Sequence, residues 1–260
     1  VVGFHWGIAG AAIATVVSQV ASAVYCFFNV RKITILQVLP GDLKPSRDLT
    51  LTLLKLGFPM ALQNAIIAVG SMVVQFVING YGMLFLAGFT ATNKLYGILE
   101  IAATSYGFAV TSYVGQNLGA GDPDRVRQAV RSGLLLSLGA TALLTALVQL
   151  AAAPIIALFE PENAAVTAEG VRYLRICCSV NGLIYAAMYV FDSFAIGSGA
   201  SWVAMCNAML DAALLRLPLC WLLAFPLALG PAGIYLGQAF SPILPALAGL
   251  CYFRLRCRRS

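Results

Sequence analysis

The chain has 260 residues, of which 60% are hydrophobic and only 10% are charged, and its mean hydropathy is +0.87. Soluble globular proteins carry about 25% charged residues, so this composition excludes that class and indicates a membrane protein. The formal charge of +6 would suit nucleic acid only if the basic residues gathered on one folded surface, whereas in membrane proteins they mark cytoplasmic loops. No nucleic-acid partner is therefore expected.

Long apolar runs predict seven membrane-spanning helices. The runs are apolar on both faces, unlike the alternating strands of a β-barrel, and helices of about 20 apolar residues would use up the chain. Clusters of glycine and proline separate them. The sequence thus predicts an all-α, polytopic membrane helix bundle. In chain order, the predicted spans are residues 7–30, 56–79, 84–118, 132–159, 173–196, 202–227 and 232–253.

The basic residues predict how the bundle is oriented. If the spans alternate in direction, 12 of the 16 Lys and Arg residues fall on one side, which we expect to be the cytoplasm. The first helix then starts outside, and the C-terminus of this multi-pass cell-membrane protein is cytoplasmic. The basic residues on that side are Arg31, Lys32, Lys44, Arg47, Lys55, Arg125, Arg127, Arg131, Arg254, Arg256, Arg258 and Arg259.

Charged side chains inside the spans are few, and each needs a partner or a water-filled cavity because burial in lipid costs about 2.5 to 3.5 kcal/mol on insertion scales. Lys94 and Glu100 lie six residues apart on one helix and are not expected to pair directly. We expect Asp211 and Arg216 to pair structurally, bridged by a neighbouring helix.

Other polar residues in the spans have two interpretations. Gln63, Asn64 and Gln75 either form hydrogen bonds across helices or line a substrate cavity. Asp192, near the end of its span, lies either at a wet helix end or in a binding site. The candidate cavity residues are Gln63, Asn64, Gln75, Glu100 and Asp192.

The chain offers little for catalysis or metal binding. His5 is the single histidine, and no paired acids or activated nucleophile are evident, so we expect neither an enzyme nor a resident cofactor or metal. The tyrosines and tryptophans are expected to serve in packing and at the membrane interfaces.

Four motifs lie in order on the predicted spans: WGIAGAAIAT at 6–15, LGFP at 56–59, GQNLGAG at 115–121 and RLPL at 216–219. Together they resemble the multidrug and toxic compound extrusion (MATE) family over nearly the whole chain. Members of that family have two six-helix lobes around a central cleft. They export organic, often cationic, compounds by alternating access, in exchange for Na⁺ or H⁺.

The resemblance implies that this chain corresponds to helices six to twelve of such a carrier. Residues 1–32 would form the last helix of the N-terminal lobe, 33–55 a cytoplasmic linker, 56–254 the six-helix C-terminal lobe and 255–260 a basic tail. The abrupt start at Val1 then suggests a fragment. The implied partners are a small organic substrate, the lipid bilayer and the N-terminal lobe of the same protein.

The resemblance also implies a cation-binding role for Thr15, which matches a threonine of the family's N-terminal-lobe site. Alternatively, the Thr15 hydroxyl bonds a carbonyl of its own helix. In some relatives a second site combines a glutamate on helix seven with an aspartate on helix ten. Here helix seven has no acid, and Asp192 lies about two turns beyond the expected aspartate, which favours ion coupling in the N-terminal lobe.

Two alternatives remain open at the level of sequence. A lipid-linked oligosaccharide flippase has a related architecture, and a broad basic cavity would support it. A chain with seven spans would also suit a receptor or a light-driven pump in which Lys94 forms a Schiff base.

Overall fold

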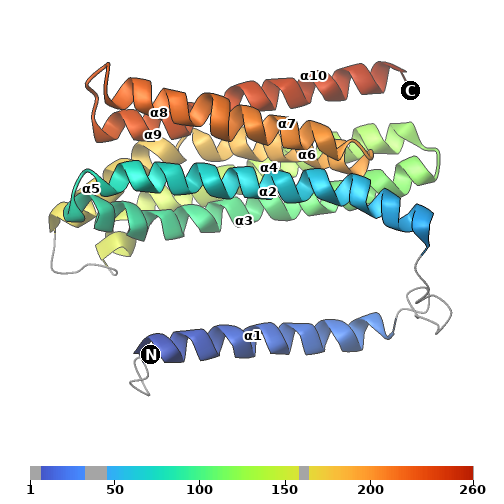
Figure 1. Ribbon diagram of the computed structural model, residues 1–260, viewed down its shortest axis with the longest axis horizontal. Coiled ribbons are helices and arrows are strands. Elements are labelled where there is room, and N and C mark those ends of the chain that lie inside the picture. Colours follow the sequence, from blue (N-terminus) through green and yellow to red (C-terminus); the bar gives the residue numbers. More distant parts are fainter. Residues whose placement is uncertain (1–6, 33–45, 158–163, 260) are drawn as a thin grey trace. The chain divides into compact units, whose positions relative to one another are not determined.

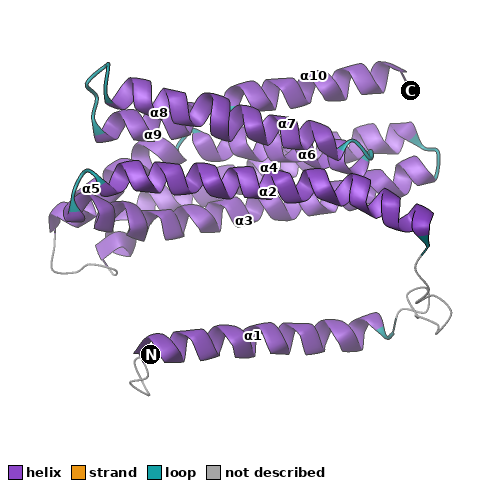
Figure 2. Ribbon diagram, viewed as in Figure 1, coloured by secondary structure: helices purple, strands orange, loops and turns teal. Residues whose placement is uncertain are grey.

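The computed structural model describes residues 7–32, 46–157 and 164–259. Within these ranges the chain is built of helices and contains no strand, as Figure 2 shows, which confirms the all-α prediction. The chain divides into two units, Val1–Leu51 and Thr52–Ser260, each of which is described by itself.

The first unit contains helix α1, Gly7–Val30, whose bounds match the first predicted span. Its 24 residues are enough to cross the hydrocarbon core of a bilayer. At its C-terminal end the Arg31 guanidinium lies 4.4 Å from the centre of the Phe27 ring, which is a cation–π contact.

The second unit is a bundle of helices that run alongside one another (Figure 1). It contains most of α2 and every later element. These elements are α2 (Arg47–Asn79), α3 (Met83–Gly119), α4 (Pro123–Ala157), α5 (Ala164–Tyr173), η3 (Leu174–Cys178), α6 (Asn181–Gly197), α7 (Ser201–Met209), η4 (Leu210–Arg216), α8 (Leu217–Ala224), α9 (Pro231–Phe240) and α10 (Ile243–Arg259).

The last three predicted spans are helical but interrupted. The fifth contains the π-helical segment η3 and bends by 44° between Cys178 and Asn181. The sixth contains the π-helical segment η4, and the seventh is broken at Ser241 and Pro242. Proline accounts for the second and third irregularities, because Pro218 and Pro242 lack the N–H that would bond one turn earlier.

Several helices suit a bilayer. Among the described residues five are long and apolar enough to cross it, or six if the bent pair that ends in α6 is one span. The third predicted span falls on α3, which has 37 residues but is not among them. Glu100 and several amide and hydroxyl side chains lower the hydropathy of α3.

Two glycines bring α8 and α9 into close contact. A Cβ atom on Gly233 would lie 2.5 Å from the backbone carbon of Leu223, and one on Gly237 would lie 2.7 Å from the backbone nitrogen of Cys220. The two glycines are spaced as in the GxxxG motif, in which small residues let membrane helices approach closely. The turn that joins α8 to α9 has positive φ at Ala228 and Gly230.

Candidate functional site

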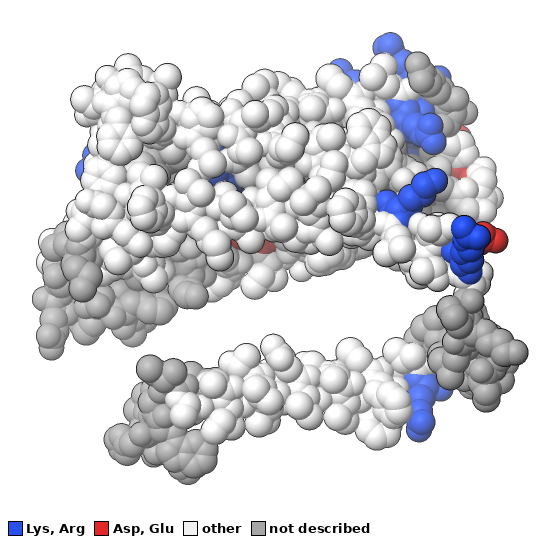
Figure 3. Space-filling model, viewed as in Figure 1, with Lys and Arg blue, Asp and Glu red and all other residues white. Residues whose placement is uncertain are grey.

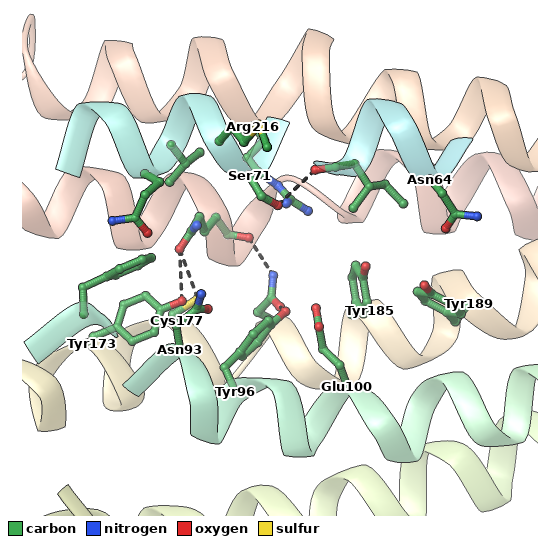
Figure 4. A pocket seen from close by; sticks show the side chains of 17 residues that line it. Asn64, Ser71, Asn93, Tyr96, Glu100, Tyr173, Cys177, Tyr185, Tyr189 and Arg216 are labelled. Carbon is green, nitrogen blue, oxygen red and sulfur yellow. Dashed lines mark hydrogen bonds between the residues drawn. The ribbon is translucent and has the colours of Figure 1, made fainter. Parts of the chain in front are cut away.

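A cavity of about 470 Å³ lies inside the second unit, among side chains from α2, α3, α5, η3, α6, η4 and α9 (Figure 4). Its lining is unusually polar for the interior of a membrane protein. The polar and charged lining residues are Asn64, Ser71, Gln75, Asn93, Tyr96, Glu100, Tyr173, Cys177, Asn181, Tyr185, Tyr189, Arg216 and Gln238.

Gln238, on α9, ties together the elements on one side of the cavity. Its side-chain oxygen accepts a hydrogen bond from the Tyr173 hydroxyl at 3.2 Å and from the Cys177 thiol at 4.0 Å. Its backbone oxygen accepts one from the Asn181 amide at 2.6 Å, and the Tyr96 hydroxyl donates to the Asn181 side-chain oxygen. These bonds join α3, α5, η3 and α6 to α9. They therefore hold this wall of the cavity at the point where α5 passes into the irregular segment η3.

An ion pair lies at the edge of the same cavity. Arg216 Nη2 is 2.5 Å from Asp211 Oδ2, and the two side chains are 13% and 2% exposed. Residues five apart do not face each other on an α-helix, but η4 is π-helical, and its i→i+5 geometry brings them onto one side. The structural pairing expected from the sequence is present, although it is direct and needs no bridging helix.

Arg216 also reaches the break in the seventh span. Its Nε donates to the Ser241 hydroxyl at 3.4 Å, at the end of α9. The other carboxylate oxygen of Asp211, Oδ1, is buried and has no hydrogen-bond partner in the described part of the chain. The guanidinium therefore connects η4 to α9 and is already largely neutralised by Asp211.

Glu100 lies across the cavity from Arg216 (Figure 4). Among the described lining residues it is the only acid, and no salt bridge to it occurs within the described ranges. The rings of Tyr185 and Tyr189, 5.0 Å apart, belong to the same wall. A carboxylate beside aromatic rings can hold an organic cation through charge and through cation–π contact.

The structure brings together three of the five predicted cavity residues: Asn64, Gln75 and Glu100 line the cavity. The Asn64 amide donates to the Met60 carbonyl at 3.0 Å, and the Gln75 amide donates to the Asn79 side chain at 3.1 Å. Gln63 is half-buried on α2 and is not among the lining residues.

Asp192 lies elsewhere in the bundle. Its side chain is buried between α6 and α7, where Asn207 donates to Oδ1 at 2.6 Å, and it does not line the cavity. Thr15 belongs to α1 in the first unit, which is described separately. The side chain of Lys94 lies outside what the structure describes.

Several lining residues were missed by the sequence interpretation. Tyr96, Tyr185 and Tyr189 were expected in packing and at the interfaces. A signal was available, because Tyr96 and Glu100 are four residues apart on one helix, as are Tyr185 and Tyr189, so each pair shares a face. The contacts between Asn181 and Gln238 had no such signal, since these residues lie on different helices far apart in the chain.

Comparison with known sequences finds a family model and several curated relatives. The MatE family model matches residues 59–222. The chain is 30% identical over 259 residues to the probable multidrug resistance protein YpnP of Bacillus subtilis, covering 96% of this chain and 55% of that protein. It is 23% identical over 256 residues to the probable multidrug resistance protein NorM of Thermotoga maritima, covering 95% and 53%. The chain thus spans about half the length of these curated relatives.

Comparison with solved structures gives the same fold. A crystal structure of MATE in complex with MaL6 aligns with a TM-score of 0.88 at 18% identity, over 98% of this chain and 58% of the other. An outward-facing multidrug resistance MATE family transporter of the MOP superfamily aligns with a TM-score of 0.87 at 20% identity, over 98% and 57%.

Proposed function

We propose, on the premise that this chain belongs to the MatE family of multidrug and toxic compound extrusion (MATE) transporters, that it forms part of a secondary active transporter. The carrier exports organic cations across the cell membrane by alternating access, in exchange for Na⁺ or H⁺. The family is the one that the sequence motifs resemble.

The observation that carries the proposal is the polar cavity with Glu100 in its wall. A carboxylate in the interior of a membrane bundle is costly unless it meets water or a cation. The one basic lining residue, Arg216, is paired with Asp211 rather than with Glu100 among the described residues. A cationic cargo is therefore the natural counterion of Glu100.

The irregular helices around the cavity support alternating access. Secondary transporters commonly bind cargo near mid-membrane, at discontinuous helices that rock around the site. Here η3, η4 and the break at Ser241 all lie close to cavity residues and are joined by Gln238 and Arg216. Bending at these points would change access to the cavity without unpacking the bundle.

The division of the chain follows as part of the proposal. We assign residues 1–32 to the last helix of an N-terminal lobe, 33–55 to a cytoplasmic linker that includes the first turns of α2, 56–254 to a six-helix C-terminal lobe and 255–260 to a cytoplasmic tail that begins within the last turn of α10. The other lobe, which this chain would contact in the carrier, completes the cleft. Thr15 on α1 then contributes to the coupling-cation site.

The flippase alternative has less support, because the cavity offers one basic residue and that residue is already paired. A cavity for a lipid-linked phosphate would need a broad basic lining. The receptor and light-driven pump alternatives have no counterpart among the relatives described above.

The test is exchange by the full-length carrier in liposomes. Uptake of a cationic dye is followed under an imposed Na⁺ or pH gradient, for the wild type and for Glu100→Gln. Loss of the carboxylate should lower the rate about tenfold, equivalent to roughly 1.4 kcal/mol of lost cation binding. The matched control is Asp124→Asn, which removes an exposed carboxylate on α4 and should leave exchange unchanged. Failure of the wild type to exchange any cationic dye, or a full rate for Glu100→Gln, would contradict the proposal.

A further inference from the structure

A second hollow, of about 450 Å³, lies at one end of the bundle. One wall is the turn between α6 and α7 together with the first turn of α7, and the other is the C-terminal part of α10. The lining side chains include Ser198 and Trp202 on the first wall, and Tyr252, Leu255 and Arg256 on the second. None of them lines the cavity around Glu100.

This groove lies at the basic end of the bundle. Figure 3 shows Lys and Arg side chains gathered where α10 ends and α2 begins, and α10 itself carries Arg254, Arg256 and Arg258. The acids nearest in sequence to the basic residues of α4 are already engaged, since Asp122 and Asp124 pair with Arg125 and Arg127. The end as a whole is therefore positively charged.

The side chains of the groove also indicate the level at which it would lie in a bilayer. Arginines at the end of a membrane helix mark the level of the lipid headgroups, and tryptophan and tyrosine prefer the same level. Trp202 is 58% exposed and Leu255 is 60% exposed, so the groove presents apolar surface beside the Arg256 guanidinium. These side chains favour a position of the groove at the boundary between headgroups and hydrocarbon.

We propose that this groove binds one anionic phospholipid, with the phosphodiester on Arg256 and the glycerol and upper acyl chain against Trp202, Tyr252 and Leu255. Arginine suits a phosphate because its planar guanidinium offers paired donors to two oxygens. Basic pockets between membrane helices on the cytoplasmic side favour anionic headgroups. The occupant is a lipid rather than a free phosphate, because most of the described lining is apolar or aromatic surface that a small anion would leave exposed.

The test is native mass spectrometry of the full-length, delipidated carrier titrated with phosphatidylglycerol or phosphatidylcholine. The first phosphatidylglycerol should bind about tenfold more tightly than the first phosphatidylcholine. Arg256→Gln should remove that preference. Arg258→Gln, which takes the same charge from the same helix but lies outside the groove, should retain it.

Three results would overturn the proposal. Equal binding of the two lipids would mean that the groove does not distinguish an anionic headgroup from a zwitterionic one. An equal loss in both arginine variants would mean that diffuse charge, not this groove, selects the lipid. Displacement of phosphatidylglycerol by millimolar inorganic phosphate would identify a small-anion site instead. Since both arginines are exposed, neither variant should impair folding, and an unchanged elution volume checks this.

Discussion

Arg216 and Asp211 illustrate how one pair of residues determines the local structure around it. The carboxylate is 2% exposed, so among the described contacts of the guanidinium, removing its charge would leave the weak bond to Ser241. We predict that Asp211→Asn lowers the free energy of unfolding by about 3 kcal/mol, the usual cost of breaking a buried ion pair on one side. Thermal unfolding of the purified carrier in detergent measures this.

The double variant Asp211→Leu with Arg216→Met provides the control for that prediction. It removes both charges together, so no buried charge is left unpaired, and it should recover most of the stability lost in the single variant. If Asp211→Asn unfolds at the wild-type temperature, the pair does not hold η4 in place.

At the level of single residues, the sequence predicts part of the site. Asn64, Gln75 and Glu100 could be identified because a polar side chain inside an apolar run is costly and therefore informative. Gln63 satisfied the same criterion yet lies outside the cavity, because adjacent residues on a helix point in different directions. Arg216 was assigned to pairing alone, and its position on the cavity wall follows from the π-helical turn.

At the level of elements, the contact between α8 and α9 depends on the absence of side chains at Gly233 and Gly237. A Cβ at Gly237 would meet the backbone of Cys220, which cannot move aside as a flexible side chain would. We predict that Gly237→Ala lowers the free energy of unfolding by about 1 to 3 kcal/mol through overpacking. Chemical denaturation or thermal unfolding of the carrier gives the difference.

Gly57→Ala is the matched substitution, since a Cβ at Gly57 meets nothing within 4 Å and the residue lies inside α2. Alanine favours the helix over glycine by roughly 0.5 to 1 kcal/mol, so stability should hold or rise. Equal effects of the two substitutions would mean that the close approach of α8 and α9 is unimportant.

The elements also show where sequence patterns reach their limit. Apolar runs located the spans, and α1 begins and ends where the pattern predicted. The first turns of α2 and α4 are polar and lie outside the apolar runs, so hydropathy did not predict them as helical. Both helices therefore begin earlier than predicted, at Arg47 and Pro123. Proline accounts for the irregularities beside Pro218 and Pro242, but η3 contains no proline. A π-helical turn of that kind depends on the packing of neighbouring helices, which hydropathy does not record.

For the whole molecule, the proposed function requires that the cavity among the broken helices of the second unit receives cargo from the two sides of the membrane in turn. Asn93 is suited to test this, because it is exposed on α3 and lines the cavity. Ser105 lies on the same helix, is also exposed and does not line the cavity. The two positions therefore differ mainly in which surface they face.

The most direct measurement is labelling of Asn93→Cys in the full-length carrier in liposomes, with a membrane-impermeant maleimide added from either side. The background replaces Cys26, Cys206 and Cys251, the exposed native cysteines of the described ranges, with alanine, and the same protein without Asn93→Cys gives the baseline. We predict that Asn93→Cys is labelled from both sides and that a cationic dye slows this labelling, whereas the dye does not protect Ser105→Cys. If Asn93→Cys reacts from one side only under every gradient, or the dye never slows it, the cavity is not the transport site.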